Sequence, residues 1–276
     1  MHFSVLLPVY KGDDATNFAR AVDSISLDQT LRPNQVVIVI DGPIPCSIGK
    51  VIKDKKELLK SLDIDYFILH LNQNVGLAKA LDTGLKYCKF DCVARADADD
   101  ISVPTRFEEQ IQLMDKYDLV GSDIVEFIED ENVTSTLRQM PSGKVQILKA
   151  AKIRSPYAHP SVIFKKSLVY KAGGYVNVDK LEDYYLFARM LMLDIETKNI
   201  SKPLVKYRVG SGAYSRRGGY KMFLSELKLQ KEFLKIGFIT RKEFVRNVTV
   251  RAVYRLIPTF IRKIAYTIMV KTNWSR

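Results

Sequence analysis

The chain has 276 residues, of which 47% are hydrophobic, enough to bury the core of one large domain or of two interlocked ones. Its 43 Lys and Arg outnumber its 31 Asp and Glu, and the excess lies entirely in residues 201–276, which hold 18 basic against 3 acidic side chains. No run of about 18 uncharged apolar residues is present, which argues against a membrane-spanning protein. A charged-then-apolar leader and paired cysteines are also missing, which argues against a secreted, disulfide-bonded protein.

Strand and helix candidates alternate in the first hundred residues. Short apolar or β-branched runs predict strands at residues 3–9, 36–40, 65–71 and 90–94. Helical spacing predicts helices between them, at residues 17–27, 50–62 and 76–87. Continuous apolar strands separated by amphipathic helices are typical of an α/β fold, in which helices flank a mostly parallel central sheet.

The second half is less regular. It suggests strands at residues 118–127 and 161–164, and a polar stretch follows the first of them through residue 142. Helices are expected at residues 144–153, 166–172 and 182–193. Because we find neither an internal repeat nor a low-complexity linker, we expect the two halves to share one compact body.

An acidic run follows the fourth predicted strand, with Asp97, Asp99 and Asp100 inside four residues. In an extended segment Asp97 and Asp99 point to the same side, and the small Ala96 and Ala98 leave that side uncrowded. Such carboxylates suit a hard divalent cation. The alternative is an acidic turn that caps the helix after it.

Polar side chains also follow the other strands. Tyr10, Asp41, Asn74 and Asp97 each come just after a predicted strand. In open parallel sheets ligands bind at the carboxyl ends of the strands. This coincidence favours the functional interpretation of the acidic run.

Five segments, taken in order, resemble family 2 glycosyltransferases, of the kind that builds bacterial exopolysaccharide, capsule or O-antigen. These are residues 4–10, 37–43, 74–81, 97–100 and 182–183, with further similarity at 159–162, 207–210 and 216–219. The resemblance implies a Rossmann-like GT-A fold and a nucleotide-diphospho-sugar donor. It also implies a divalent cation, Mn²⁺ or Mg²⁺, and an inverting single displacement by an acceptor hydroxyl.

The same resemblance assigns roles to the acidic residues. Asp99 would be the main metal ligand, and Asp97 would support the metal or bind a ribose hydroxyl of the donor. Asp183 would be the catalytic base, because inversion needs one carboxylate to take the proton of the acceptor. The alternative for Glu182-Asp183 is that carboxylates are favoured at any helix start.

The resemblance also places the donor. The implied donor-binding residues are Pro8, Val9, Tyr10, Asp41, Asn74, Gly76, Lys79, Asp97, Arg216 and Arg217. Asp41 would recognise the base, although many relatives have a second acidic residue where this chain has Ile40, and a turn Asp that bonds nearby backbone is the alternative. A core aromatic is the alternative for Tyr10, and a solvated helix residue for Lys79.

In the second half, one motif differs from that of the family and another has two possible interpretations. His159 would line the acceptor side or would be a structural histidine. Many relatives have a metal-binding His where this chain has Gly210. Arg216 and Arg217 would instead hold the diphosphate, because guanidinium groups match phosphate oxygens.

We expect three segments: residues 1–100 as the nucleotide-sugar-binding half, 101–219 as the acceptor-binding and catalytic half of the same domain, and 220–276 as a basic amphipathic helical tail. Pro258 would divide this tail into two helices. The tail would lie on an anionic membrane surface. The alternative is a helical pair that docks on the body.

The expected function is transfer of a hexose, from UDP-sugar above other donors, to a hydroxyl of a polyprenyl-diphosphate-linked saccharide. The protein would work in the cytoplasm, on the inner face of the cell membrane, and would bind no nucleic acid. A sugar nucleotidyltransferase is an alternative, but the Gly-rich phosphate loop after the first strand is missing, and an aspartyl phosphatase would carry its acidic motif there. A non-enzymatic, basic polyanion- or membrane-binding protein would leave Asp41, Asp99 and Asp183 without a role.

Overall fold

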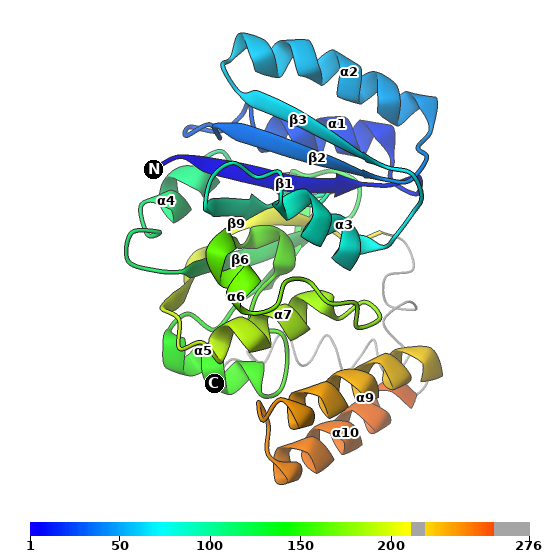
Figure 1. The fold of residues 1–276 in the computed structure, drawn as a ribbon, viewed down its shortest axis with the longest axis vertical. Coiled ribbons are helices and arrows are strands. Elements are labelled where there is room, and N and C mark those ends of the chain that lie inside the picture. The colour runs from blue at the N-terminus through cyan, green and yellow to red at the C-terminus, as the bar shows by residue number, and fades with distance from the viewer. Residues whose placement is uncertain (211–218, 257–276) are drawn as a thin grey trace.

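A computed structural model of the chain describes residues 1–210 and 219–256 (Figure 1). Its strands are β1 (Phe3–Val9), β2 (Gln35–Asp41), β3 (Asp65–Leu71), β4 (Cys92–Arg95), β5 (Ile101–Ser102), β6 (Leu119–Phe127), β7 (Thr134–Arg138), β8 (Ile163–Lys165) and β9 (Thr197–Arg208). Its α-helices are α1 (Ala15–Ser24), α2 (Cys46–Ser61), α3 (Leu77–Leu85), α4 (Arg106–Ile111), α5 (Lys144–Ala151), α6 (Lys166–Lys171), α7 (Glu182–Leu191), α9 (Tyr220–Lys235) and α10 (Arg241–Leu256). The strands form one sheet in the order β3-β2-β1-β4-β8-β6-β9-β5, and β7 pairs with β6.

The first half of the sheet is parallel and covered on both faces, as the continuous apolar strands predict. β3, β2, β1 and β4 are paired in parallel. Alternate residues of β2 enter different cores: Val37 and Val39 pack in the same cluster as Leu81 of α3. Val36 and Ile38 pack in the cluster that holds residues of α1 and α2, which lie on the other face (Figure 1). The expected α/β class is confirmed.

The second half of the sheet is mixed and contains strands that the sequence did not predict. β8 runs antiparallel to both β4 and β6, and β9 runs parallel to β6 and antiparallel to β5. The missed strands are β5, β7 and β9. β5 has two residues and β7 is largely exposed, while β9 mixes buried and exposed positions without strict alternation, so none of them carries the usual apolar pattern.

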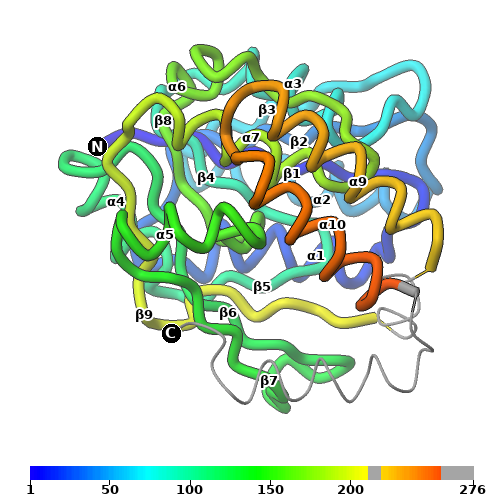
Figure 2. The backbone as a smooth tube through the Cα atoms, turned by 90° about the horizontal axis from the view of Figure 1, so that it is seen from below, coloured from blue at the N-terminus to red at the C-terminus, as the bar shows by residue number. Residues whose placement is uncertain are grey.

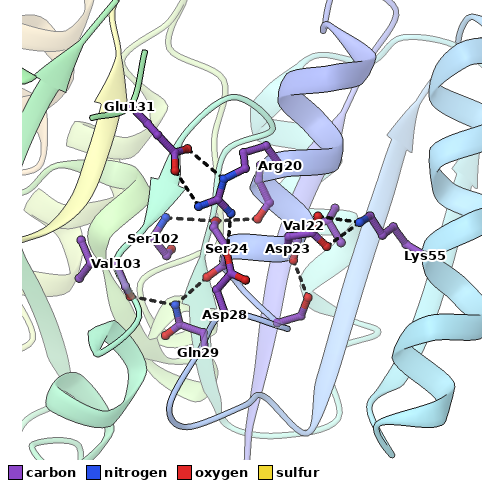
Figure 3. Close-up of polar contacts among 12 residues, drawn as sticks. Arg20, Val22, Asp23, Ser24, Asp28, Gln29, Lys55, Ser102, Val103 and Glu131 are labelled. Atoms are coloured by element: carbon purple, nitrogen blue, oxygen red, sulfur yellow. Dashed lines mark hydrogen bonds and ion pairs between the residues drawn. The ribbon is translucent and has the colours of Figure 1, made fainter. Parts of the chain in front are cut away.

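The segment after the acidic run is fixed by the end of α1. The backbone N–H of Ser102 donates to Ser24 Oγ over 3.1 Å, and Gln29 Nε2 donates to the carbonyl of Val103 over 2.9 Å (Figure 3). β4 anchors the other side of the acidic run. The loop between β4 and β5 is therefore held at both ends.

Arg20 of α1 ties this region to the β6–β7 loop. Its guanidinium donates to Asp28 Oδ2 over 2.6 Å and to both carboxylate oxygens of Glu131 over 2.8 and 2.9 Å (Figure 3). Bidentate pairs of this kind fix geometry as well as charge.

The helices α9 and α10 lie side by side and dock on the body next to α7 (Figures 1 and 2). Leu229 and Phe233 of α9 are fully buried in the core cluster that contains Tyr184, and the rings of Phe233 and Tyr184 meet edge to face at 5.0 Å. Asn247 of α10 is buried too, and donates to the carbonyl of Lys152 over 2.7 Å. This part of the tail is therefore a docked helical pair, and Pro258 lies outside the described residues.

Within residues 1–210 and 219–256, each helix is either too short or too polar to cross a bilayer.

We expect Leu229→Ala to destabilise the protein by about 2–5 kcal/mol, because it leaves a cavity where α9 enters the core. Leu224→Ala is the matched control, since this leucine of the same helix is 43% exposed and its loss should change the free energy of unfolding by less than about 0.5 kcal/mol. Urea denaturation measures both. Equal, small effects of the two changes would contradict the docking of α9.

Candidate functional site

The carboxyl ends of three neighbouring parallel strands form one edge of the sheet. β1 lies between β2 and β4, with Val9 opposite Ile40 and Leu6 opposite Arg95. Tyr10, Asp41 and the acidic run therefore leave the sheet on the same side. This is the edge where the sequence placed the ligand.

A third carboxylate, Asp13, joins Asp97 and Asp99. Burial raises the pKa of Asp13 to about 6, and the charges of Asp99 and Asp97 raise it further. A hydrogen bond from the backbone N–H of Tyr10, at 2.9 Å, acts in the opposite direction and lowers this pKa. Burial also raises the pKa of Asp99 to about 6, with the charge of Asp97 as the second cause. Asp13 therefore lies in the field of Asp97 and Asp99, and Asp99 lies in the field of Asp97.

Sequence reasoning missed Asp13, although a signal was present. It is the first residue of the pair Asp13-Asp14 that precedes α1. Only Asp14 is used as the helix cap, where its Oδ1 accepts from the N–H groups of Thr16 and Asn17 at 2.9 Å. Because Asp14 alone caps the helix, the neighbouring carboxylate of Asp13 is available for another role.

The buried guanidinium of Arg95, the last residue of β4, lies under the acidic run. It donates to Asp97 Oδ1 and to the carbonyl of Ala96, and its side chain is inaccessible to solvent. Its Nε has no hydrogen-bond partner among the described residues. A second buried arginine, Arg106, donates to the carbonyl of Arg95 over 2.8 Å; burial, and then the charge of Arg95, lowers the pKa of Arg106 to about 9.

Asp100 is buried and contributes to the fold through one of its two carboxylate oxygens. Its Oδ1 accepts from the backbone N–H of Arg208 over 2.8 Å, and Arg208 Nε donates to the carbonyl of Asp99 over 3.0 Å. Burial raises the pKa of Asp100 well above its usual range. Arg208, part of the motif at residues 207–210, thus holds the acidic turn in place.

Asp97 and Asp183 line the same cavity, whose volume is about 590 Å³. Asp183 lies in the first turn of α7, where burial raises its pKa to about 6, against a hydrogen bond from the backbone N–H of Tyr184. His159 also lines the cavity, and its Nε2 lies 3.0 Å from Tyr175 Oη. Burial lowers the pKa of His159 well below its usual range, so its ring is neutral at pH 7.

Asp41 lies at the same edge but is not among the residues that line this cavity. Its carboxylate accepts from the N–H groups of Val75 and Gly76 over 2.7 and 3.1 Å, and its carbonyl accepts from Asn74 Nδ2 over 3.2 Å. Gly42 has φ of +84° and approaches this loop so closely that an added Cβ would lie 2.5 Å from the backbone nitrogen of Asn74. Asp41 therefore shapes the loop before α3.

The other proposed donor residues differ in exposure. Pro8 and Val9 are buried within β1, while the ring of Tyr10 is 45% exposed. Lys79 is also exposed, on the first turn of α3. Arg216 and Arg217 lie outside the described residues.

The acidic residues fit a divalent cation in chemical type. Within residues 1–210 and 219–256 no group of three or more His, Cys, Asp or Glu has the arrangement of a complete metal site. However, Mg²⁺ and similar ions are usually held by one or two carboxylates, with phosphate oxygens and water as the remaining ligands. Asp97 and Asp99 supply such a pair, and the charge of Asp97 contributes to the raised pKa of Asp99.

A family model described as glycosyl transferase family 2 matches residues 4–173. The chain is 34% identical to a protein of Escherichia coli named UDP-Gal:alpha-D-GlcNAc-diphosphoundecaprenol beta-1,3-galactosyltransferase, over 98% of this chain and 96% of the relative. It is 33% identical to the amylovoran biosynthesis glycosyltransferase AmsE of Erwinia amylovora, over 96% of this chain and 97% of that protein.

Solved structures share the fold at low sequence identity. S. aureus TarS in complex with UDP-GlcNAc superposes with a TM-score of 0.62 at 15% identity, over 85% of this chain and 67% of that one. The mannosyltransferase PcManGT from Pyrobaculum calidifontis, in complex with GDP-Man and Mn²⁺, gives a TM-score of 0.60 at 16% identity, over 98% of this chain and 74% of the other.

We expect the free energy of unfolding to fall as the pH rises through about 6. Asp13 and Asp99 ionise near their usual pKa of 3.8 in the unfolded chain but near 6 in the folded one. Between these values the folded state binds more protons, so their stabilising contribution is complete below pH 3.8 and is lost as they ionise. Asp13→Asn should reduce this loss and make the metal-free protein more stable than the wild type at neutral pH.

Urea denaturation in EDTA, repeated at several pH values, measures the effect. Asp14→Asn is the control, because Asn caps a helix about as well as Asp and this side chain is exposed. If Asp13→Asn is no more stable than the wild type at neutral pH, Asp13 does not belong to the repulsive cluster.

Proposed function

The chain belongs to glycosyl transferase family 2, and we propose that it transfers a hexose from a UDP-sugar to a hydroxyl of a saccharide linked through diphosphate to a polyprenyl lipid. The family match and the fold confirm the resemblance seen in the motifs and the expectation of a glycosyltransferase. Polysaccharide biosynthesis is the common theme of the relatives. The relative from Escherichia coli is named for UDP-Gal and a diphosphoundecaprenol-linked GlcNAc, which supports the finer proposal.

The observation that carries the proposal is that Asp97 and Asp183 line one cavity. Glycosyl transfer needs a group that receives the leaving diphosphate and a base that activates the acceptor. The acidic run offers ligands for a cation that would receive the diphosphate, and the start of α7 offers the base, from segments far apart in the sequence. The sugar nucleotidyltransferase alternative gives Asp183 no comparable task.

In the proposed mechanism Asp183 accepts the proton of the acceptor hydroxyl as the sugar is attacked from the face opposite the diphosphate. A carboxylate with a pKa of about 6 is a stronger base than an ordinary Asp and is still ionised at pH 7. A divalent cation, Mn²⁺ or Mg²⁺, held by Asp97 and Asp99 would neutralise the charge that develops on the leaving diphosphate.

Donor binding is proposed for the edge formed by the ends of β1 and β2. Tyr10 presents an exposed ring that would stack on the base. Asp41 would either bind the base directly or, through its contacts with the loop that contains Asn74 and Gly76, fix the shape of the loop around the base. Lys79 would attract the phosphates. Backbone groups of Pro8 and Val9 and the side chains of Arg216 and Arg217 complete the proposed set.

We also propose that the enzyme works at the cytoplasmic face of the membrane, where a polyprenyl-linked acceptor is presented. Residues 201–276 carry 18 Lys and Arg against 3 Asp and Glu, and each basic residue near an anionic surface contributes about 1 kcal/mol of attraction.

The test is a panel of nucleotide sugars, assayed with Mn²⁺ or Mg²⁺ and a GlcNAc-diphospho-lipid acceptor. We expect transfer from a UDP-hexose, its loss in EDTA and its recovery when the metal is restored. Mass spectrometry of the lipid product identifies the sugar. Absence of binding and of turnover for every donor would refute the proposal.

Asp183→Asn should lower kcat by about 10²–10⁴-fold while the Kd for the donor stays nearly unchanged. For the wild type, kcat/KM should fall about tenfold per pH unit below about 6, as Asp183 takes up a proton. Asp179→Asn is the matched control, since Asp179 is exposed and pairs with Lys228 outside the cavity. Near-normal transfer by Asp183→Asn would show that another group is the base.

A further inference from the structure

The cavity that contains Asp97 and Asp183 also has a basic part. Arg138 at the end of β7, Arg154 after α5 and Arg251 on α10 line it. Arg138 and Arg154 belong to neighbouring segments of the body, and Arg251 joins them because α10 docks there. We call them the arginine cluster.

Arg154 is the arginine of this cluster that most clearly lacks a hydrogen-bond acceptor among the described residues. Within residues 1–210 and 219–256 its guanidinium makes no hydrogen bond or ion pair. Burial lowers the pKa of Arg154, and the nearby positive charge of Arg138 lowers it further. A partly buried guanidinium with five N–H donors is costly unless an acceptor reaches it.

Within the described part of the chain, the other two arginines have partners but make no hydrogen bond to a carboxylate, and Arg251 Nη2 donates to the carbonyl of Ile153 over 2.6 Å. Arg138 lies 3.7 Å from Glu126, and Arg251 Nε lies 3.7 Å from Glu226, both too far for a hydrogen bond. Arg251 Nε is buried without a hydrogen-bond partner among the described residues. Glu226 is instead held by Arg255, over 2.7 and 3.0 Å.

The arginine cluster lies next to the proposed base. Tyr184 directly follows Asp183, and the charges of Arg251 and Arg154 are both close enough to act on its phenol. Three apolar side chains that also line the cavity are unusually exposed, between 40% and 46%. They are Leu137, Ile153 and Val250.

We propose that the arginine cluster is a subsite for the diphosphate of the acceptor and that the three apolar side chains beside it receive the first carbons of the lipid. The inference rests on the proposed function, since a sugar with its hydroxyl at Asp183 would carry its diphosphate away from the donor and toward these arginines. Guanidinium groups bind paired phosphate oxygens through two parallel hydrogen bonds. The helix α10 is therefore part of the acceptor site.

Arg154→Gln tests the proposal with little risk to folding, because the wild-type guanidinium holds no structural partner among the described residues. Two acceptors are compared: GlcNAc-diphosphate with a short alkyl chain, and the alkyl glycoside of GlcNAc without phosphate. Arg154→Gln should raise KM for the diphosphate acceptor about 10–100-fold, leave KM for the phosphate-free acceptor unchanged, and leave the Kd for UDP unchanged. Arg154→Lys should recover part of the loss.

Arg246→Gln is the matched control for charge, because Arg246 belongs to the same helix as Arg251 but does not line the cavity. It should leave both acceptors unaffected. A weaker Kd for UDP in Arg154→Gln would assign the cluster to the donor and overturn the proposal, as would an unchanged KM for the diphosphate acceptor. If the wild type transfers to neither acceptor and binds no donor, it is the proposed function that fails.

Discussion

The arrangement of this enzyme depends on one buried cation. Arg95 carries a charge with no access to solvent, at the point where the acidic run, His159 and the start of α7 come together. Four carboxylates in this region, Asp13, Asp99, Asp100 and Asp183, have pKa values raised chiefly by burial, so the fold holds negative charge that it does not stabilise well. Without Arg95 this concentration of charge would be harder to keep. Unfavourable charge of this kind is typical of sites built for a ligand rather than for stability.

Much of the fold could be predicted because its signals are local. The strands β1 and β2 are buried on both faces and therefore read as unbroken apolar runs, and β3 was predicted with its observed bounds. β9 could not be found in this way. Its exposed residues Ser201 and Lys202 lie where its register with β6 shifts, and that pairing is decided by distant parts of the chain. The strand expected at residues 161–164 begins two residues later, at Ile163, because His159–Ser161 forms a short 3-10 helix.

The residues of the candidate site that lie inside sequence motifs could be predicted. Those that reach the site only because the fold brings distant segments together were harder to predict. The motifs singled out Asp97 and Asp183, which line one cavity, whereas the pair Asp13-Asp14 indicates at most a spare carboxylate and not that Asp13 lies in the field of Asp97 and Asp99. The arginine cluster is a stronger example. Arg154 lies in a segment without any motif, Arg138 is at the end of a strand that the sequence did not predict, and Arg251 reaches them only through the docking of α10. The excess of Lys and Arg counted along residues 201–276 suggested binding to a membrane surface. In the fold, one of these residues, Arg251, also faces the cavity.

The clamp of Arg208 on the acidic turn has a consequence for how the protein is made. The bond from its backbone N–H to Asp100 spans 108 positions of the sequence. On the ribosome, the first half of the molecule emerges long before this partner does, and domains generally fold as their segments are synthesised. Every nascent chain shorter than 208 residues therefore holds the acidic turn only through β4 and through the contacts of Ser102 and Val103 with Ser24 and Gln29. The acidic turn of the proposed metal site would therefore take its final shape only after Arg208 has been synthesised.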